Sequence, residues 1–313
     1  MHPRRASVAN VPRISNHRPL IFALSVALPC ILLLQPTAVA EPTATLTHVT
    51  RSSAWSPPSP DPMGLAYHPS RQRLVVVDSE VEETPLFQGK NAWLLGMDGE
   101  PRRAWSLTTF TMEPTDVAAK GRRTLFFIDD VADQVFIVRR GRDGRWGSKD
   151  DAIRSFSTRP FGSRDPEGLE FADGALFISD GDDKEVYRID RGGDGRFDGA
   201  PPEGDDVVTS FDTRALGVHD PEDLAYDRSE RLLYLISRTD LVVVRATLEG
   251  ELVDVIDLSD FDLIEPAGIA VVPGPDPSTR RVYVADRGID NNESQGGDPN
   301  ENDGRIFEFV LTV

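Results

Sequence analysis

The sequence contains very little cysteine and histidine. Its 313 residues include one cysteine, Cys30, and five histidines. A single cysteine allows no internal disulfide and no thiolate cluster for zinc or iron. Only His48, His68 and His219 lie beyond residue 40, and their wide separation argues against a three-histidine catalytic zinc site. The chain also lacks a Gly-x-Ser-x-Gly elbow, a Walker loop and a dinucleotide-binding fingerprint.

Basic charge is scarce as well. The chain has 34 Lys and Arg against 52 Asp and Glu, a formal net charge of −18, and no run of basic residues is longer than two. Nucleic acid and anionic membrane surfaces are therefore not expected as partners, because the overall field repels them. The hydrophobic fraction of 39% is sufficient for a folded domain.

Residues 1–40 have the pattern of an export signal. They contain four arginines and no acidic residue, an apolar stretch from Leu20 to Leu34, and Ala38-Val39-Ala40 before Glu41. The apolar stretch is too short to span a bilayer, and a lipoprotein signal ending at Cys30 is the alternative. Cleavage after Ala40 would leave a chain of net charge −22 without cysteine, since it removes four basic and no acidic residues. We expect a periplasmic or secreted protein without stable membrane insertion.

One short phrase recurs along the remaining chain at intervals of 45 to 55 residues. Each copy has an acidic residue, a proline and, three residues beyond the proline, an aliphatic residue. The five copies begin at Asp61, Glu113, Asp165, Asp220 and Glu265. Each copy opens a short apolar strand, and a second strand follows, as in Leu74–Asp78 and Leu125–Asp129. A third strand and a fourth, expected over Ala104–Leu107 in the first unit, complete most units. Repetition at this period is typical of β-propeller blades.

We predict an all-β fold, a single β-propeller domain over residues 41–313 with five four-stranded blades. The fifth unit ends after its third strand, and Thr43–Val49 at the other end of the mature chain can supply the fourth. Six blades, the alternative, would require a unit that the sequence does not show. No segment has the pattern of an amphipathic helix.

The repeat resembles a known group of secreted propellers. The third unit contains Pro166-Glu167-Gly168-Leu169, then Leu176–Asp180 and Val186-Tyr187-Arg188-Ile189. This pattern is similar to the NHL-type, gluconolactonase-like and esterase-like phytase propellers. The resemblance covers nearly all of the mature chain, and it implies a propeller fold and, as one option, a metal-dependent hydrolase.

Acidic residues recur at two positions of each unit. In a propeller, the residue before each proline and the last residue of each second strand lie at the same end of the channel. Nine of these ten positions carry a carboxylate and are candidate Ca²⁺ ligands: Asp61, Asp78, Glu113, Asp129, Asp165, Asp180, Asp220, Glu265 and Asp286. The alternative is structural, because aspartate before proline starts turns and aspartate at a strand end accepts loop N–H groups.

Two long loops break the symmetry of the repeat. The loops 79–91 of the first unit and 287–304 of the fifth become neighbours when the ring closes, and they would rise over the same acidic mouth. The candidate ligand-binding residues are Glu80, Glu82, Glu83, Asn91, Arg287, Asp290, Asn291 and Asn292. A solvated acidic insertion is the alternative.

Two loops at the opposite end resemble calcium-binding loops, since Asp-Gly is followed by paired aspartates. Weaker metal candidates there are Asp143, Asp150, Asp151, Asp194, Asp205 and Asp206. Extended hairpins with an Asp-Gly turn explain the same residues without metal.

The sequence leaves two functions open. One is a calcium-associated propeller that binds a small molecule, a carbohydrate or an extracellular partner at its acidic mouth. The other is a Ca²⁺-dependent hydrolase of an ester, lactone or phosphoester. His219, which adjoins Asp220, is the candidate proton carrier for catalysis.

Overall fold

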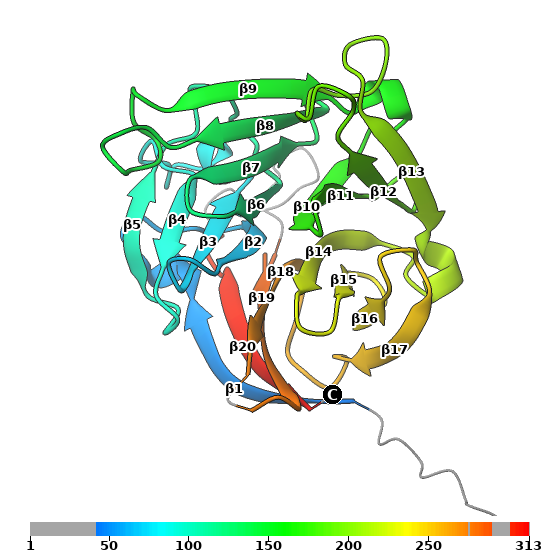
Figure 1. The fold of residues 1–313 in the computed structure, drawn as a ribbon. Coiled ribbons are helices and arrows are strands. Elements are labelled where there is room, and N and C mark those ends of the chain that lie inside the picture. The colour runs from blue at the N-terminus through cyan, green and yellow to red at the C-terminus, as the bar shows by residue number, and fades with distance from the viewer. Residues whose placement is uncertain (1–41, 275, 290–300, 313) are drawn as a thin grey trace, which may run out of the picture. The chain divides into compact units, whose positions relative to one another are not determined.

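The computed structural model describes residues 42–274, 276–289 and 301–312. The predicted export signal and the candidates Asp290, Asn291 and Asn292 lie outside the described residues. The described chain folds into five antiparallel four-stranded sheets arranged as blades around a central channel, so the prediction of a five-bladed β-propeller is confirmed (Figure 1). No described helix is long and apolar enough to cross a membrane.

The first four blades each use consecutive strands. Blade 1 contains β2 (Pro62–His68), β3 (Arg73–Asp78), β4 (Ala92–Leu95) and β5 (Pro101–Trp105). Blade 2 contains β6 (Asp116–Lys120), β7 (Thr124–Asp129), β8 (Gln134–Arg139) and β9 (Ala152–Ser157). Blade 3 contains β10 (Pro166–Ala172), β11 (Ala175–Asp180), β12 (Glu185–Asp190) and β13 (Val207–Asp212). Blade 4 contains β14 (Pro221–Asp227), β15 (Leu232–Ser237), β16 (Val242–Ala246) and β17 (Leu252–Asp257).

Blade 5 joins the two ends of the domain. It contains β18 (Pro266–Pro273), β19 (Thr279–Asp286), β20 (Arg305–Thr312) and, as its outermost strand, β1 (Thr43–Arg51). Strand β1 pairs antiparallel with β20 from Thr43 opposite Thr312 to Arg51 opposite Arg305. The predicted closure by the N-terminal strand is therefore confirmed. It leaves β20 paired on both sides rather than as an open edge.

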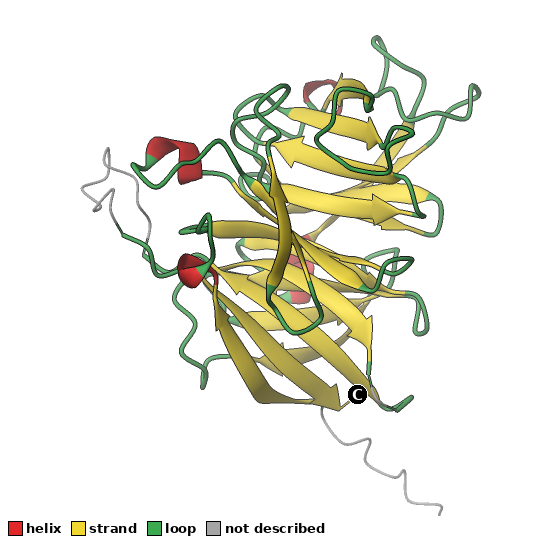
Figure 2. Cartoon of the chain, turned by 90° about the vertical axis from the view of Figure 1, so that its left-hand side faces the viewer, coloured by secondary structure: helices red, strands yellow, loops and turns green. Residues whose placement is uncertain are grey.

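The helices are single 3₁₀ turns in the loops: η1 (Ser52–Ala54), η2 (Val81–Glu83), η3 (Arg159–Phe161) and η4 (Thr213–Leu216). Seen from the side, loops leave the blades at both ends of the channel (Figure 2). We call the end where the inner strands β2, β6, β10, β14 and β18 begin the acidic mouth, and the other end the lower end.

The core consists of apolar layers between neighbouring blades. Along β7, Leu125 and Phe127 pack toward blade 1, whereas Phe126 and Ile128 pack toward blade 3. Successive side chains of a strand point to opposite faces, and both faces of each blade are covered. This explains why the second strands are continuous apolar runs rather than alternating ones.

Close approach of the inner strands requires glycine in the recurring phrase. A Cβ added to Gly64 would lie 2.3 Å from Cα of Asp116, and one added to Gly268 would lie 2.3 Å from the carbonyl oxygen of Met63. No side chain fits at such distances, because backbone atoms of the neighbouring strand occupy the space.

Candidate functional site

The four carboxylates that end the second strands anchor loops. Asp78 accepts hydrogen bonds from the Ser59 hydroxyl (2.7 Å) and from the N–H groups of Asp61 (3.1 Å) and Val81 (2.8 Å). Asp180 repeats the arrangement with Ser163 (2.7 Å) and the N–H of Asp183 (2.7 Å). These contacts join the loop before the inner strand to the loop after the second strand.

Asp129 and Asp286, the other two carboxylates of this set, also anchor loops but have different partners. Asp129 accepts from the Thr111 hydroxyl at 2.6 Å, and Asp286 accepts from the N–H of Glu265 at 2.8 Å and is paired with Arg305. In blade 4 the strand ends in Ser237, which donates to Asp240 at 2.6 Å. Loop anchoring thus accounts for the recurrence of this set, and a metal-binding role for it stays a prediction.

The mouth itself is formed by a different group of carboxylates. Asp130, Asp165 and Glu167 each bring one oxygen to within 4.8 Å of the other two. Asp130 follows β7, Asp165 precedes the proline of blade 3, and Glu167 is the second residue of β10. Of these, only Asp165 was a candidate from the sequence.

Mutual repulsion and burial raise the pKa values of this group. Burial raises the pKa of Asp130 to about 6, and Asp129 and Asp165 add to the effect. The pKa of Glu167 lies well above its usual value because of burial and the nearby Glu222, Asp130 and Asp165. Oxygen Oε2 of Glu167 is buried and has no hydrogen-bond partner in the described part of the chain.

Glu222 extends the group from blade 4. Its residue is 3% exposed, and burial raises its pKa to about 7. Oε1 of Glu222 pairs with Arg238 at 3.2 Å, while Oε2 is buried without a partner among the described residues. Arg238 also pairs with Asp220 at 3.1 Å, so one guanidinium neutralises part of the mouth.

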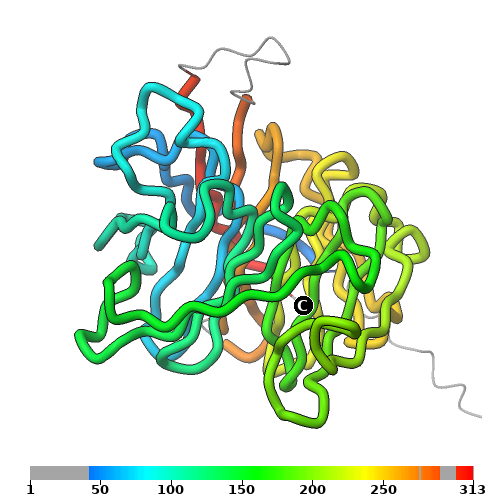
Figure 3. The backbone as a smooth tube through the Cα atoms, turned by 90° about the horizontal axis from the view of Figure 1, so that it is seen from above, coloured from blue at the N-terminus to red at the C-terminus, as the bar shows by residue number. Residues whose placement is uncertain are grey.

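The first residues of the two long loops meet at this mouth. Blades 5 and 1 are neighbours in the ring (Figure 3), and Arg287, after β19, forms an ion pair with Glu80, after β3. Glu82, in η2, has its pKa raised to about 8 by burial and by Glu113, Asp78 and Glu83. Glu83 is exposed. Asn91 is buried and structural, since it accepts from the N–H of Leu107 at 2.8 Å.

The remaining candidates are not members of the group formed by Asp130, Asp165 and Glu167. Asp61 is fully buried. His219 is on the exposed rim, with Nδ1 at 3.0 Å from an oxygen of Asp240 and 63% of its side chain exposed. Glu113 lies in the mouth, where burial and Asp130 raise its pKa. Glu265 contributes to the raised pKa of Glu222.

The loops at the lower end are organised by aspartate–backbone hydrogen bonds. Asp150 accepts from the N–H of Arg142 (2.6 Å), Asp151 from Gly141 (2.9 Å) and Asp143 from Arg145 (2.8 Å). In the second loop, Asp206 accepts from Gly199 at 2.8 Å and Asp205 from Gly193 at 2.7 Å.

This second loop also contains a carboxylate group. Oxygens of Asp194, Asp198 and Asp205 lie within 4.8 Å of one another, and all three residues are at or near the surface. Two of the three were candidates from the sequence. Calcium in this loop stays a prediction.

Inside the channel, two carboxyl groups from opposite sides meet. Asp116 of β6 and Asp223 of β14 are hydrogen-bonded to each other, and both are buried. Asp116 also accepts from the N–H of Leu65 (3.1 Å) and of Leu169 (2.6 Å), and Asp223 accepts from the N–H of Ile269 (2.7 Å). Burial and the charge of Asp223 hold the pKa of Asp116 well above its usual range, and burial raises the pKa of Asp223 to about 7, so the pair shares a proton at neutral pH.

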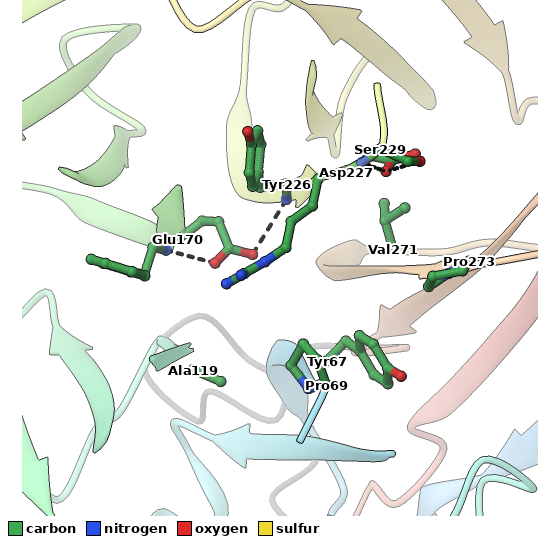
Figure 4. Close-up of a pocket in the computed structure, with 11 residues that line it drawn as sticks. Tyr67, Pro69, Ala119, Glu170, Tyr226, Asp227, Ser229, Val271 and Pro273 are labelled. Carbon is green, nitrogen blue, oxygen red and sulfur yellow. Dashed lines mark hydrogen bonds between the residues drawn. The ribbon is translucent and has the colours of Figure 1, made fainter. Parts of the chain in front are cut away.

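A cavity of about 350 Å³ opens at the lower end of the channel (Figure 4). Tyr67, Phe171, Tyr226 and Val271 give it a mainly apolar lining. Glu170 is a partly buried carboxyl group in its wall, with oxygens that accept from the N–H groups of Phe171 (2.6 Å) and Tyr226 (3.3 Å). Burial raises the pKa of Glu170 to about 8.

Sequence reasoning missed Asp130, Glu167 and Glu222 at the mouth. Glu167 and Glu222 occupy the position between proline and the following Gly or Asp in the recurring phrase, where the other units have Met63, Thr115 and Ala267. Only blades 3 and 4 carry an acid there, and these blades are adjacent. An acidic residue at this position in two consecutive units was the feature of the sequence that could have indicated Glu167 and Glu222.

Comparison with known proteins supports the fold. No family model matches the chain, and no curated protein sequence matches it. Among solved structures, glutaminyl cyclase of Myxococcus xanthus has a TM-score of 0.57 at 16% identity, over 87% of this chain and 98% of that one. The PQQ-bound aldose sugar dehydrogenase of Streptomyces coelicolor has a TM-score of 0.48 at 14% identity, over 87% and 99%. The similarity to glutaminyl cyclase, at 16% identity, supports the β-propeller fold alone, and it does not single out the NHL or phytase group.

Proposed function

We propose that this protein is an exported, calcium-associated β-propeller that binds a ligand or an extracellular partner at its acidic mouth. The convergence of Asp130, Asp165 and Glu167 within 4.8 Å is the observation that carries the proposal. Such a spacing suits oxygen atoms around one hard cation, and Ca²⁺ accepts irregular sets of carboxylate ligands. The loops 79–91 and 287–304 would provide the surface that contacts the ligand.

The electrostatics of the mouth favour a cation there. Buried oxygens of Glu167 and Glu222 lack hydrogen-bond partners in the described chain, and such atoms are costly unless something satisfies them. Arg287 and Arg238 offset only part of the charge, as the raised pKa values of Glu167 and Glu222 indicate. A divalent cation would replace the protons that these groups otherwise retain.

Calcium titration tests this proposal. We expect Ca²⁺ to raise the melting temperature of the EDTA-treated protein, since it binds only the folded state. The double substitution Asp165→Asn and Glu167→Gln should weaken Ca²⁺ binding about tenfold or more, because it removes two charged ligands. Substitution of Asp194 and Asp205 by Asn removes the same charge from the lower-end loop and should leave the mouth affinity unchanged.

Two results would contradict the proposal. One is a melting curve that Ca²⁺ does not shift. The other is a Ca²⁺ affinity that falls with the Asp194 and Asp205 substitutions but not with those at Asp165 and Glu167. The control pair Glu251→Gln and Asp260→Asn, both exposed, measures the effect of net charge alone.

A Ca²⁺-dependent hydrolase is the second candidate, and the state of Glu82 favours it. Burial and the neighbouring Glu113, Asp78 and Glu83 raise the pKa of Glu82 to about 8, which favours the neutral carboxylic acid at pH 7, the form that a general acid needs. A panel of esters, lactones and phosphoesters with added Ca²⁺ tests this function. The hydrolase function is supported if the protein turns over a substrate and Glu82→Gln abolishes the turnover without loss of Ca²⁺ binding. The absence of turnover on the whole panel excludes this function.

A further inference from the structure

A groove at the lower end, between blades 2 and 3, is lined by cationic side chains. It has a volume of about 810 Å³. Blade 2 contributes Lys120, Arg122, Arg123, Arg139 and Arg154, and blade 3 contributes Arg191 and Arg196. This concentration stands out in a chain with 34 basic and 52 acidic residues.

Most of these cations have no carboxylate partner. Within the described chain, Arg196 pairs with Asp194 at 3.7 Å, and the other six form no ion pair. Elsewhere many arginines are paired, as Arg245 is with Glu230 and Arg280 with Asp227. Like charges gathered without counter-charges repel one another, so the arrangement favours a bound anion.

Packing fixes the position of the charge at the groove floor. The ammonium of Lys120 lies 4.6 Å from the ring centre of Phe171 and 5.2 Å from that of Phe197. Arg191 of blade 3 lies over the same ring, with its guanidinium carbon 5.5 Å from the ring centre of Phe197. Phe126 packs edge-on against Phe197 at 5.8 Å, which holds this aromatic base in place.

Strand register aligns two further arginines along the groove. Arg154 of β9 is opposite Ile137 of β8, and Arg139 is two residues beyond Ile137. Side chains two residues apart on a strand share a face, so Arg139 and Arg154 are diagonal neighbours on one face of blade 2. That face is the one directed toward blade 3, because Ile137 belongs to the core layer between these blades.

We infer that this groove is a binding site for a compact, multiply charged anion bearing phosphate or sulfate groups. Arginine and lysine are the residues that bind such groups by charge-assisted hydrogen bonds. The strongly negative net charge argues against a long polyanion, which would extend beyond the groove into the acidic surroundings. A compact anion interacts mainly with charges within a Debye length, about 8 Å at physiological salt.

Titration calorimetry with tripolyphosphate in EDTA-containing buffer of low ionic strength tests the site. EDTA keeps the acidic mouth free of Ca²⁺, so the result does not depend on the proposed function. We expect a dissociation constant below about 1 mM. The double substitution Arg139→Ser and Arg154→Ser should weaken binding about tenfold or more, and Arg139→Lys with Arg154→Lys should restore part of it. Neither arginine makes a described side-chain hydrogen bond, so the fold should be unaffected.

The control variant Arg51→Ser and Arg164→Ser removes two exposed positive charges outside the groove. Equal weakening by this control would show a general effect of net charge and would overturn the inference. Absence of tripolyphosphate binding to the unsubstituted protein would also overturn it. Tighter binding of a 12-nucleotide single-stranded DNA than of tripolyphosphate would reject the compact-anion class.

Discussion

Asp116 and Asp223 occupy the place that glycine takes in the other three inner strands. In those strands glycine leaves room for the neighbouring backbone, as at Gly64, which faces Asp116. The two aspartates use the space to accept N–H groups of β2, β10 and β18. One shared proton thus lets two carboxyl groups connect inner strands across the channel, where an unshared pair of charges would repel.

Replacing Asp116 by alanine should destabilise the fold by roughly 2 to 6 kcal/mol, because it leaves the N–H groups of Leu65 and Leu169 unsatisfied. Asn should cost less, since it keeps a donor and one acceptor. Because the pKa of Asp116 is raised in the folded protein, its contribution to the free energy of unfolding is complete at pH values below its unfolded pKa, near 4. That contribution declines as the pH rises through the folded pKa. The penalty of the Ala substitution should therefore be larger at pH 5 than at pH 9, as measured by urea unfolding. A penalty that is the same at both pH values would contradict the shared proton.

Among the strands, removal of the closing strand β1 has the clearest expected consequence for stability. It covers the edge of β20 over its whole length, and β20 carries the buried Phe307, Phe309 and Leu311. Deleting residues 42–51 should expose that edge, lower the melting temperature and promote aggregation. A synthetic peptide of residues 42–51 added in trans should restore part of the stability, and a peptide of the same composition in scrambled order should not. An unchanged melting curve after deletion would show that the ring closes without β1.

The sequence was sufficient to predict the elements, because the apolar strands recur in phase with the proline phrase. It placed the second strands and the closing strand correctly, and it misplaced the end of the fourth strand of blade 1, expected over Ala104–Leu107 and found over Pro101–Trp105. Asn91 explains this difference, since its side chain accepts the N–H of Leu107 and ends the ladder there.

The site was less predictable than the fold for a physical reason. Periodicity shows that a residue recurs at a strand end, but it does not show whether its oxygens point to loop amides or to the channel. Asp180 and Asp165 are both acidic and both near the mouth, yet Asp180 accepts loop N–H groups while Asp165 joins the group with Asp130 and Glu167. The sequence did not indicate the basic groove, because its Lys and Arg residues lie in separate turns and strands of two blades.

Across the whole molecule, charge is distributed differently at the two ends of the channel. Carboxyl groups converge at the mouth, where the inner strands begin, and cations line the groove beside the lower end. From net charge alone, nucleic acid and anionic membrane surfaces were not expected as partners. The structure instead gathers cations from two blades in one groove, so two ligands of opposite charge could be bound independently at the two proposed sites.

This distribution predicts how stability depends on pH. Burial raises the pKa of Glu170 and Glu82 to about 8, of Glu222 to about 7 and of Asp130 to about 6. A carboxyl group whose pKa is higher in the folded than in the unfolded protein stabilises the fold fully at pH values below its unfolded pKa, which is near 4. This contribution to the free energy of unfolding is lost as the pH rises through the folded pKa. The free energy of unfolding should therefore fall between about pH 5 and pH 8 in EDTA, by on the order of 3 kcal/mol for a single fully buried group.

Calcium should flatten this pH dependence, because a cation at the mouth favours the ionised carboxylates there. Denaturant unfolding at pH 5, 6.5 and 8, with EDTA and with Ca²⁺, measures the effect. We expect little stabilisation by Ca²⁺ at pH 5, where protons compete for the ligands, and the largest at pH 8. The variant with Asp165→Asn and Glu167→Gln should lose the stabilisation by Ca²⁺. It should keep the pH dependence of stability that Glu170 causes, because Glu170 lies at the other end of the channel. Stabilisation by Ca²⁺ of equal size at all three pH values would show that the cation binds carboxylates that are already ionised, and would assign it to the exposed loop of Asp194 and Asp205 instead.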